Sequence, residues 1–359
     1  MASRPDTSGH GRQHYADFRV TLDGQDLTAT VRPRLISLRL TEKRGGEADE
    51  LELVLDDSDG KLEIPRKGVV IGCALGWRRG TDVPIGLVDK GRFTVDDASW
   101  DTAPDTVTIR ARSADLTAGY RVRRERSHRD TTLGALVARV AAAHGYTPRV
   151  DPSLAGILVP VLVQDGKSDM AMIRDLGRRH DAVATVKDRR LILAPIGKRT
   201  TSTGAAIPAA TITRASGDRA SWKTSERQAY TKVEARWHDQ GAAERRTIAH
   251  PVAGAAKADG VDKGTNDGKV RRLKRTFHTQ ADADAAARAE AGRVARGGAE
   301  LTINLALGRP DFYPDRRVTA AGFKRGVDGS DWLIAEVSHN LDGQGGLRTD
   351  LKLETGAAE

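Results

Sequence analysis

The stretch Val31–Gly60 reads VRPRLISLRLTEKRGGEADELELVLDDSDG, and its pattern decides the fold class. Apolar and polar residues alternate over Ile36–Leu40, the Gly45–Gly46 pair turns the chain, and the alternation returns over Leu51–Leu55. Because successive side chains of a strand point to opposite faces, this pattern predicts an antiparallel hairpin with one buried face and one face in water.

Further short stretches around this hairpin have the character of strands. They lie at Phe18–Leu22, Val69–Leu75, Gly91–Val95 and Val107–Ala111. Short strands that are separated by turns, such as Asp23-Gly24, are typical of a β-sandwich or a β-barrel. We therefore expect a mainly β domain over residues 15–116, preceded by a flexible polar arm over residues 1–14.

Helical signals appear in the middle of the chain. A threonine at 131 or 132 can cap a first helix, and Gly145 stands where a left-handed C-cap is needed. A second helix is predicted over Ser168–Arg179, with the serine as its N-cap, and a hairpin over Val183–Ala194. Two helices and a hairpin predict a compact α+β unit over residues 117–200.

The rest of the chain, residues 201–359, is predicted to be β again with an insertion at about 253–298. A linker or surface loop over Gly197–Ala210 leads into it. The insertion comprises a polar loop and an Ala-rich helix that begins at Thr279 and that Gly297-Gly298 ends. The predicted strands are Ser221–Trp237, Leu301–Leu307, Val318–Phe323, Trp332–Val337 and Leu347–Leu353.

A weak internal echo links the two β regions. Gly86–Arg112 contains a glycine, a charged turn, aromatic and β-branched residues at alternating positions, and a closing strand. Gly322–Leu353 repeats this series. Either two antiparallel meanders share such spacing by coincidence, or the chain contains a duplicated β domain.

The sequence lacks the motifs of several common enzyme classes. Across 359 residues the sequence shows no Gly-x-Ser-x-Gly, His-Glu-x-x-His, Cys-x-x-Cys or phosphate-binding Gly-x-x-x-x-Gly-Lys-Ser/Thr motif, so we expect no catalytic residue, no metal and no cofactor. The single cysteine, Cys73, has no basic neighbour and is predicted to be a buried apolar side chain. No stretch is long and apolar enough for a membrane span or a secretory signal, which predicts a chain that is made in the cytoplasm and does not insert into membranes.

The densest basic run contains Arg121, Arg123, Arg124, Arg126 and Arg129, within a chain of formal charge +9. Such arginines could bind nucleic-acid phosphates or contact a partner protein. The other interpretation is a solvated connector whose arginines pair with neighbouring acidic residues. No helix-turn-helix, zinc-finger or stacking-aromatic pattern accompanies the run.

Several segments, in order, resemble the late control D family of phage tail proteins, the baseplate hubs of contractile tails. They are Val31–Gly60, Gly86–Asp97 (GLVDKGRFTVDD), Thr108–Leu116 (TIRARSADL), Thr132–Ile157, Ser168–Gly197 and Leu307–Gly346. The resemblance covers roughly residues 15–355, and the first fourteen residues match nothing in it.

The resemblance implies a tail-hub architecture of two similar antiparallel β-barrel domains, over 15–116 and 201–359, with a lateral α+β domain over 117–200. It implies a homotrimeric ring that adapts the hexameric tail tube to the trimeric central spike in the virion baseplate. Expected partners are the tube, the spike, the wedge proteins, and the tape-measure protein and DNA that pass through the channel. The alternatives are a nucleic-acid-binding late regulatory or packaging protein and a cell-wall hydrolase.

Overall fold

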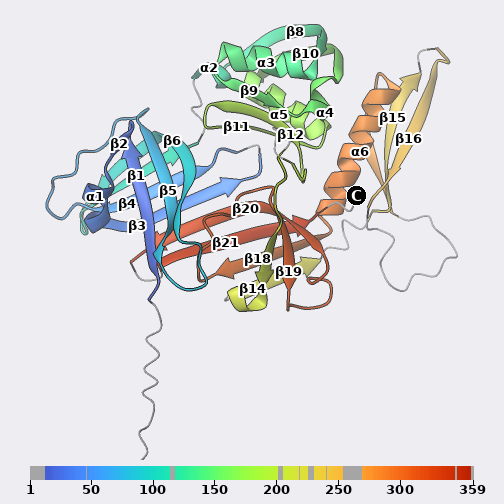
Figure 1. Cartoon of the computed structure of the whole chain (residues 1–359). Coiled ribbons are helices and arrows are strands. Elements are labelled where there is room, and N and C mark those ends of the chain that lie inside the picture. The colour runs from blue at the N-terminus through green and yellow to red at the C-terminus, as the bar shows by residue number, and fades with distance from the viewer. Residues whose placement is uncertain are drawn as a thin grey trace, which may run out of the picture.

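The computed structural model describes residues 13–45, 47–113, 118–200, 205–217, 219–224, 230–239, 241–253, 269–343 and 346–356. Most of the predicted arm (1–14) and of the predicted polar loop (253–269) therefore lies outside the described residues. The described residues form four parts: a first β unit (blue in Figure 1), a lateral unit (green), a second β unit (mainly red, with β14 in yellow) and a helix–sheet module (yellow-brown to orange).

The first β unit is a curved sheet of six strands around one apolar core. Its strands are β1 (Tyr15–Leu22), β3 (Leu35–Lys43), β4 (Glu50–Asp56), β5 (Val70–Arg79), β6 (Gly86–Asp101) and β7 (Thr106–Arg112). The predicted hairpin is confirmed, because Leu38 lies opposite Leu53 and Leu40 opposite Leu51 in the β3–β4 ladder. The short elements that connect β1 with β3 are β2 (Gln25–Asp26), α1 (Thr28–Val31) and the 3₁₀ turn η1 (Arg32–Arg34).

The lateral unit packs three-stranded and two-stranded sheets against two main helices. Its elements are α2 (Ala118–Arg121), β8 (Arg123–Thr132), α3 (Leu133–Ala143), β9 (Thr147–Val150), α4 (Pro152–Ala155), β10 (Leu158–Ser168), α5 (Asp169–Arg179), β11 (Ala182–Lys187) and β12 (Arg190–Pro195). The predicted caps are confirmed: Thr132 accepts from the backbone N–H of Ala135, Ser168 from that of Ala171, and Gly145 has a φ of +68°.

The second β unit also has six strands. They are β13 (Ala210–Thr213), β14 (Arg219–Thr224), β18 (Ala299–Leu305), β19 (Arg317–Ala321), β20 (Asp331–Asp342) and β21 (Gly346–Thr355), with the 3₁₀ turn η2 (Arg214–Ser216) after β13. Its core contains Trp332, which is fully buried and donates its indole N–H to the carbonyl of Val327.

The helix–sheet module interrupts the second β unit between β14 and β18. It consists of β15 (Lys232–Asp239), β16 (Glu244–Pro251), β17 (Val270–Phe277) and α6 (Gln280–Arg296), which pack around their own apolar core. The sequence placed the insertion at about 253–298 and a strand over Ser221–Trp237 in the second barrel. The structure instead assigns β15 to a separate sheet, so the inserted part begins at β15.

The two β units share one strand order. We number the six main strands of each unit by their order along the chain. Neighbouring strands in the sheet of the first unit then follow the order 1, 4, 5, 6, 3, 2 (β1-β5-β6-β7-β4-β3). The second unit has the same arrangement (β13-β19-β20-β21-β18-β14). The sequence echo falls on corresponding hairpins, β6–β7 and β20–β21. The topology therefore favours duplication over coincidence.

The predicted mainly β fold with an α+β insertion is confirmed, with one difference in detail. The pair β13–β19 is parallel, whereas the corresponding pair β1–β5 is antiparallel. Within the described residues, no ladder joins the first and second strands of either unit. In chain order, residues 23–34 follow the first strand of the first unit, and η2 follows that of the second unit. Closed barrels stay a prediction.

Candidate functional site

The two β units meet along strand β20. Its beginning pairs with β19 inside the second unit, and its later part pairs with β3 of the first unit, so one sheet runs through both. Thr41 lies opposite Ser338 in this ladder, and their hydroxyl oxygens are 2.9 Å apart. The relative position of the units is thus fixed by backbone hydrogen bonds between segments about three hundred residues apart in sequence.

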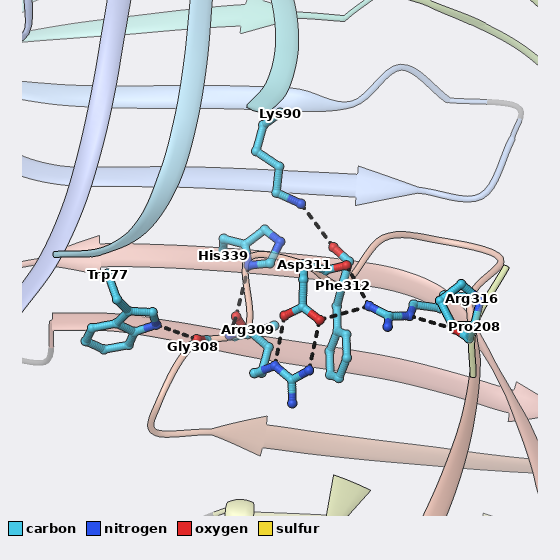
Figure 2. Close-up of polar contacts among 10 residues, drawn as sticks. Trp77, Lys90, Pro208, Gly308, Arg309, Asp311, Phe312, Arg316 and His339 are labelled. Carbon is cyan, nitrogen blue, oxygen red and sulfur yellow. Dashed lines mark hydrogen bonds and ion pairs between the residues drawn. The ribbon is translucent and has the colours of Figure 1, made fainter. Parts of the chain in front are cut away.

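A buried ion pair lies on the first-unit side of this junction. The Nζ of Lys90 lies 2.6 Å from Oε2 of Glu42 and donates to the backbone carbonyl of Phe312 at 3.0 Å (Figure 2 draws the second contact). Only 4% of the Lys90 side chain and 10% of the Glu42 side chain are exposed. Burial alone would raise the pKa of Glu42, but the ammonium of Lys90 and the contact with His339 lower it to about 2.

His339 extends this cluster from the second unit. Its Nδ1 lies 2.9 Å from the hydroxyl of Thr349, and its Nε2 is 3.4 Å from Oε2 of Glu42. Burial and the charge of Lys90 lower the pKa of His339, so the ring is neutral at pH 7. The Thr349 oxygen also accepts from the backbone N–H of Arg309, so this hydroxyl connects β21 with the loop after β18.

The loop 308–316 of the second unit completes the junction. Trp77 of β5 donates its indole N–H to the carbonyl of Gly308 at 2.8 Å (Figure 2). Arg309 and Arg316 both bind the carboxylate of Asp311, with distances of 2.8 to 2.9 Å, and both guanidinium groups stack on the buried ring of Phe312. Burial raises the pKa of Asp311, but these two arginines more than reverse it and hold that pKa below its usual value.

A second ion cluster connects all four parts of the molecule. Arg44, the residue after β3, binds Glu354 of β21 and lies 3.9 Å from Asp315. Arg296, the last residue of α6, binds Asp181 of the lateral unit with both terminal nitrogens and lies 3.4 Å from Glu354. Because each charge has a counter-charge from another part, this cluster can hold the four parts in one orientation.

Asp315 is the member of this cluster with the most unusual titration. Burial raises its pKa from 3.8 to about 6, although Arg44 and the backbone N–H of Gly197 act in the other direction. A carboxyl group whose pKa is raised on folding stabilises the fold below pH 4 and loses that contribution as the pH rises through about 6.

The Asp315→Asn variant is therefore expected to be more stable than the wild type at pH 7 to 8, by about 1–2 kcal/mol, with the difference vanishing near pH 4. Asparagine keeps an acceptor for Gly197 and tolerates the φ of +73° at this position. Urea unfolding across this pH range measures the effect. A variant that is less stable at pH 8 would show that the carboxylate is net favourable there.

The predicted basic run is not a connector but part of a ladder. Arg121 ends α2, and the other four arginines lie on β8, which pairs with β10. Arg123 and Arg129 share one face of the strand, whereas Arg124 and Arg126 share the other. Arg124 approaches the buried carboxylate of Asp169 at 3.5 Å, while Arg121, Arg123, Arg126 and Arg129 are exposed. The structure thus divides the run between two faces.

Asp169 explains part of this arrangement. Burial raises its pKa, but hydrogen bonds from His144 and Gln164, with Arg126 and Arg124 nearby, hold that pKa below its usual value.

Arg121 lines a cleft of about 260 Å³ between the first β unit and the lateral unit, together with Arg112 and Arg174.

The Glu42–Lys90–His339 cluster was not predicted from the sequence, although a signal for it was present. Glu42 continues the period-two series of Leu38 and Leu40, so it falls on the buried face of its strand. An acidic residue at such a position needs a buried partner.

Cys73 is confirmed as a buried side chain, with 2% of its surface exposed, and burial raises its pKa to about 12. Among the described residues, no group of three or more histidine, cysteine or carboxylate side chains is arranged to hold a metal ion. None of the described helices combines the length and apolar character that crossing a membrane requires.

Comparisons with known proteins agree on one family. No protein-family model matches the chain. The chain is 38% identical to a probable baseplate hub protein of Escherichia phage 186, over 94% of this chain and 93% of that protein. It is 37% identical to a probable baseplate hub protein of Escherichia phage P2, with 94% and 92% covered.

Among solved structures, a 43 kDa tail protein of prophage MuSo2 from Shewanella oneidensis has a similar fold. The TM-score is 0.65 at 14% identity, with 94% of this chain and 98% of that chain covered. Because the phage 186 and P2 proteins are similar over nearly the whole chain, the present chain belongs to the family of phage baseplate hub proteins, as the late control D resemblance predicted.

Proposed function

We propose that this structural hub protein assembles into a homotrimeric ring that adapts a hexameric tail tube to a trimeric central spike. The observation that carries the proposal is the shared strand order of the two β units. Three chains with two such units each would present six similar units on one side of a ring. The same ring has only three chains, so its other side can match a trimeric spike.

The junction described above supports this role. A ring of six units needs a constant angle between neighbours, since a heterologous contact closes only at one rotation. The continuous sheet through β20 and β3, with the buried cluster of Glu42, Lys90 and His339 beside it, supplies such a fixed angle inside the chain. The charged groups of the cluster pair with one another, which fits a structural role without catalysis.

The partners follow from this arrangement. The tube would stack on the six-unit face and the spike on the other face, with the tape-measure protein and DNA in the channel. The lateral unit, which lies to one side of the sheet that runs through both β units, would face the wedge proteins (Figure 1). Assembly would take place in the host cytoplasm, and the mature location is the tail baseplate of the virion.

Mass measurement of the purified full chain tests the proposal. We expect a species of three times the chain mass of 38.7 kDa, alone or with the spike protein of the same particle. Light scattering or mass photometry provides the measurement. A chain that stays monomeric and does not bind the spike would contradict the proposal. Duplex DNA binding that falls steeply with salt would instead favour the nucleic-acid-binding alternative.

A further inference from the structure

The shared strand order allows positions in the two β units to be matched residue by residue. In the first unit, the register runs across the sheet from Val95 on β6 to Ala111 on β7, Leu51 on β4 and Leu40 on β3. A bulge follows Val95, and five residues further along the same strand lies Trp100.

The second unit repeats this path. Its register runs from Ile334 on β20 to Leu353 on β21, Leu301 on β18 and Trp222 on β14. A bulge follows Ile334, and five residues further along lies His339. By this matching, β6 corresponds to β20 and β3 corresponds to β14.

Two of these four strands already pair inside the chain, and the other two do not. Strand β20 pairs with β3, which places His339 opposite Leu40. The corresponding edge of β14 has no ladder partner in the described part of the chain, and all six β14 residues are exposed. The end of β6 that corresponds to the paired part of β20, residues 97–101, likewise forms a ladder only with β7.

We propose that strand β14 of one copy pairs antiparallel with the end of β6 of the next copy, in the register of the β3–β20 ladder. The positions that match Leu40 and His339 are Trp222 and Trp100, so the two tryptophans lie directly opposite each other across the contact. This inference rests on the proposed trimer and names the surface that closes it. Each junction in the ring then has the same strand geometry, within a chain or between chains.

The side chains on one face of the proposed ladder suit burial. Trp100 is 51% exposed and Trp222 is 42% exposed in the single chain, which is unusual for the largest apolar side chain. A cross-strand pair of aromatic residues is a stabilising arrangement, and tryptophan is enriched among residues that dominate binding energy at interfaces.

The other face is complementary in charge. Arg219 and Lys223 of β14 lie on the face opposite to Trp222, and Asp97 and Asp101 of β6 lie on the face opposite to Trp100. In the proposed register Lys223 is diagonal to both carboxylates and Arg219 is diagonal to Asp101. None of these four groups forms an ion pair with another described residue. The contact would provide each of them with a partner.

The free edge of β1, by contrast, is blocked by its own chain. The backbone N–H of Val20 donates to the hydroxyl of Thr28, and the carbonyl of Val20 accepts from the N–H of Leu27. Arg32 donates to the carbonyl of Phe18. The chain therefore protects one strand edge and leaves β14 open, as expected for an edge that another copy covers.

Disulfide cross-linking of the full chain tests the register. The double variant Trp100→Cys/Trp222→Cys is expected to give a covalent trimer on a non-reducing gel after mild oxidation, because each chain links to both neighbours. Cys73 is buried and does not compete. In the matched control Ser99→Cys/Trp222→Cys, the two side chains point to opposite faces of the ladder, and we expect no cross-link.

A second measurement is independent of cysteine chemistry. The Trp222→Ala variant removes an exposed side chain, so the single chain should keep its fold. We expect the concentration at which trimers dissociate to rise by about 30-fold. Mass photometry over a dilution series measures this shift, with circular dichroism to verify the fold.

The outcomes separate this inference from the proposed function. Trimers that form normally but do not cross-link, and that Trp222→Ala leaves unchanged, would overturn the β14–β6 contact and leave the ring intact. A covalent dimer from the single variant Trp222→Cys would show that β14 meets a second β14, which also overturns it. A chain that is monomeric with and without its spike would overturn the ring and this contact together.

Discussion

Replacing Gly76 by alanine is expected to prevent stable folding of the first β unit. A Cβ at this position of β5 would lie 1.8 Å from the carbonyl oxygen of Gly86 and 2.9 Å from the Cα of Leu87. These are backbone atoms of the neighbouring strand β6, which cannot turn away as a side chain can. The strands would have to separate where Gly76 is opposite Leu87, at the end of the β5–β6 ladder. The next residue of β5 is Trp77, whose buried side chain belongs to the core of the unit.

We expect the free energy of unfolding of Gly76→Ala to fall by at least about 4 kcal/mol, a loss seen only for severe structural conflicts. Urea unfolding measures it. Gly72→Ala in the same strand is the matched control: its Cβ would lie 2.5 Å from the hydroxyl oxygen of Thr21, which can rotate away. We expect that variant to lose only about 1–2 kcal/mol. Equal stability of the two variants would contradict the close approach of β5 and β6.

The local elements of this fold were predictable because their signals are local. The alternation around Gly45 specified the β3–β4 hairpin, and side-chain caps at Thr132, Ser168 and Thr279 began the three long helices where the structure has them. A cap satisfies backbone groups of its own first turn, so no knowledge of distant contacts is needed.

The pairing of distant strands was not predictable in the same way. A period of two tells which face of a strand is buried, but not which strand lies beside it. The β20–β3 ladder, the separate sheet around β15 and the parallel pair β13–β19 all depend on partners far away in sequence. Strand β8 was missed because charged residues lie on both of its faces, so its sequence shows no alternation of apolar and polar residues.

The junction between the two β units can be tested by urea unfolding in the same way as the contact between β5 and β6. The Lys90→Met variant is expected to lower the free energy of unfolding at pH 7 by about 3–5 kcal/mol, because it leaves the buried carboxylate of Glu42 without its cation. Methionine retains the apolar stem of the lysine, so lost packing adds little. Urea unfolding of the full chain measures the loss.

Acid should reduce this loss. In the wild type, the lowered pKa of Glu42 means that its contribution to stability is present above about pH 4.5 and disappears only as the pH falls through about 2. Without Lys90 the pKa of Glu42 rises, since burial is no longer offset by the ammonium. The variant can then protonate Glu42 under mild acid, and its deficit relative to the wild type should shrink between pH 7 and pH 5.

The double variant Glu42→Gln/Lys90→Met distinguishes an electrostatic cause from a steric one. A neutral glutamine needs no cation, and its amide carries both a donor and an acceptor that can face Nε2 of His339 in place of the carboxylate. We expect the double variant to regain at least about 2 kcal/mol over Lys90→Met, because removing both charges of a buried pair costs less than stranding one. If the double variant is as unstable as the single one, the loss comes from the contact of Lys90 with the carbonyl of Phe312, and the link between the units would depend on that hydrogen bond.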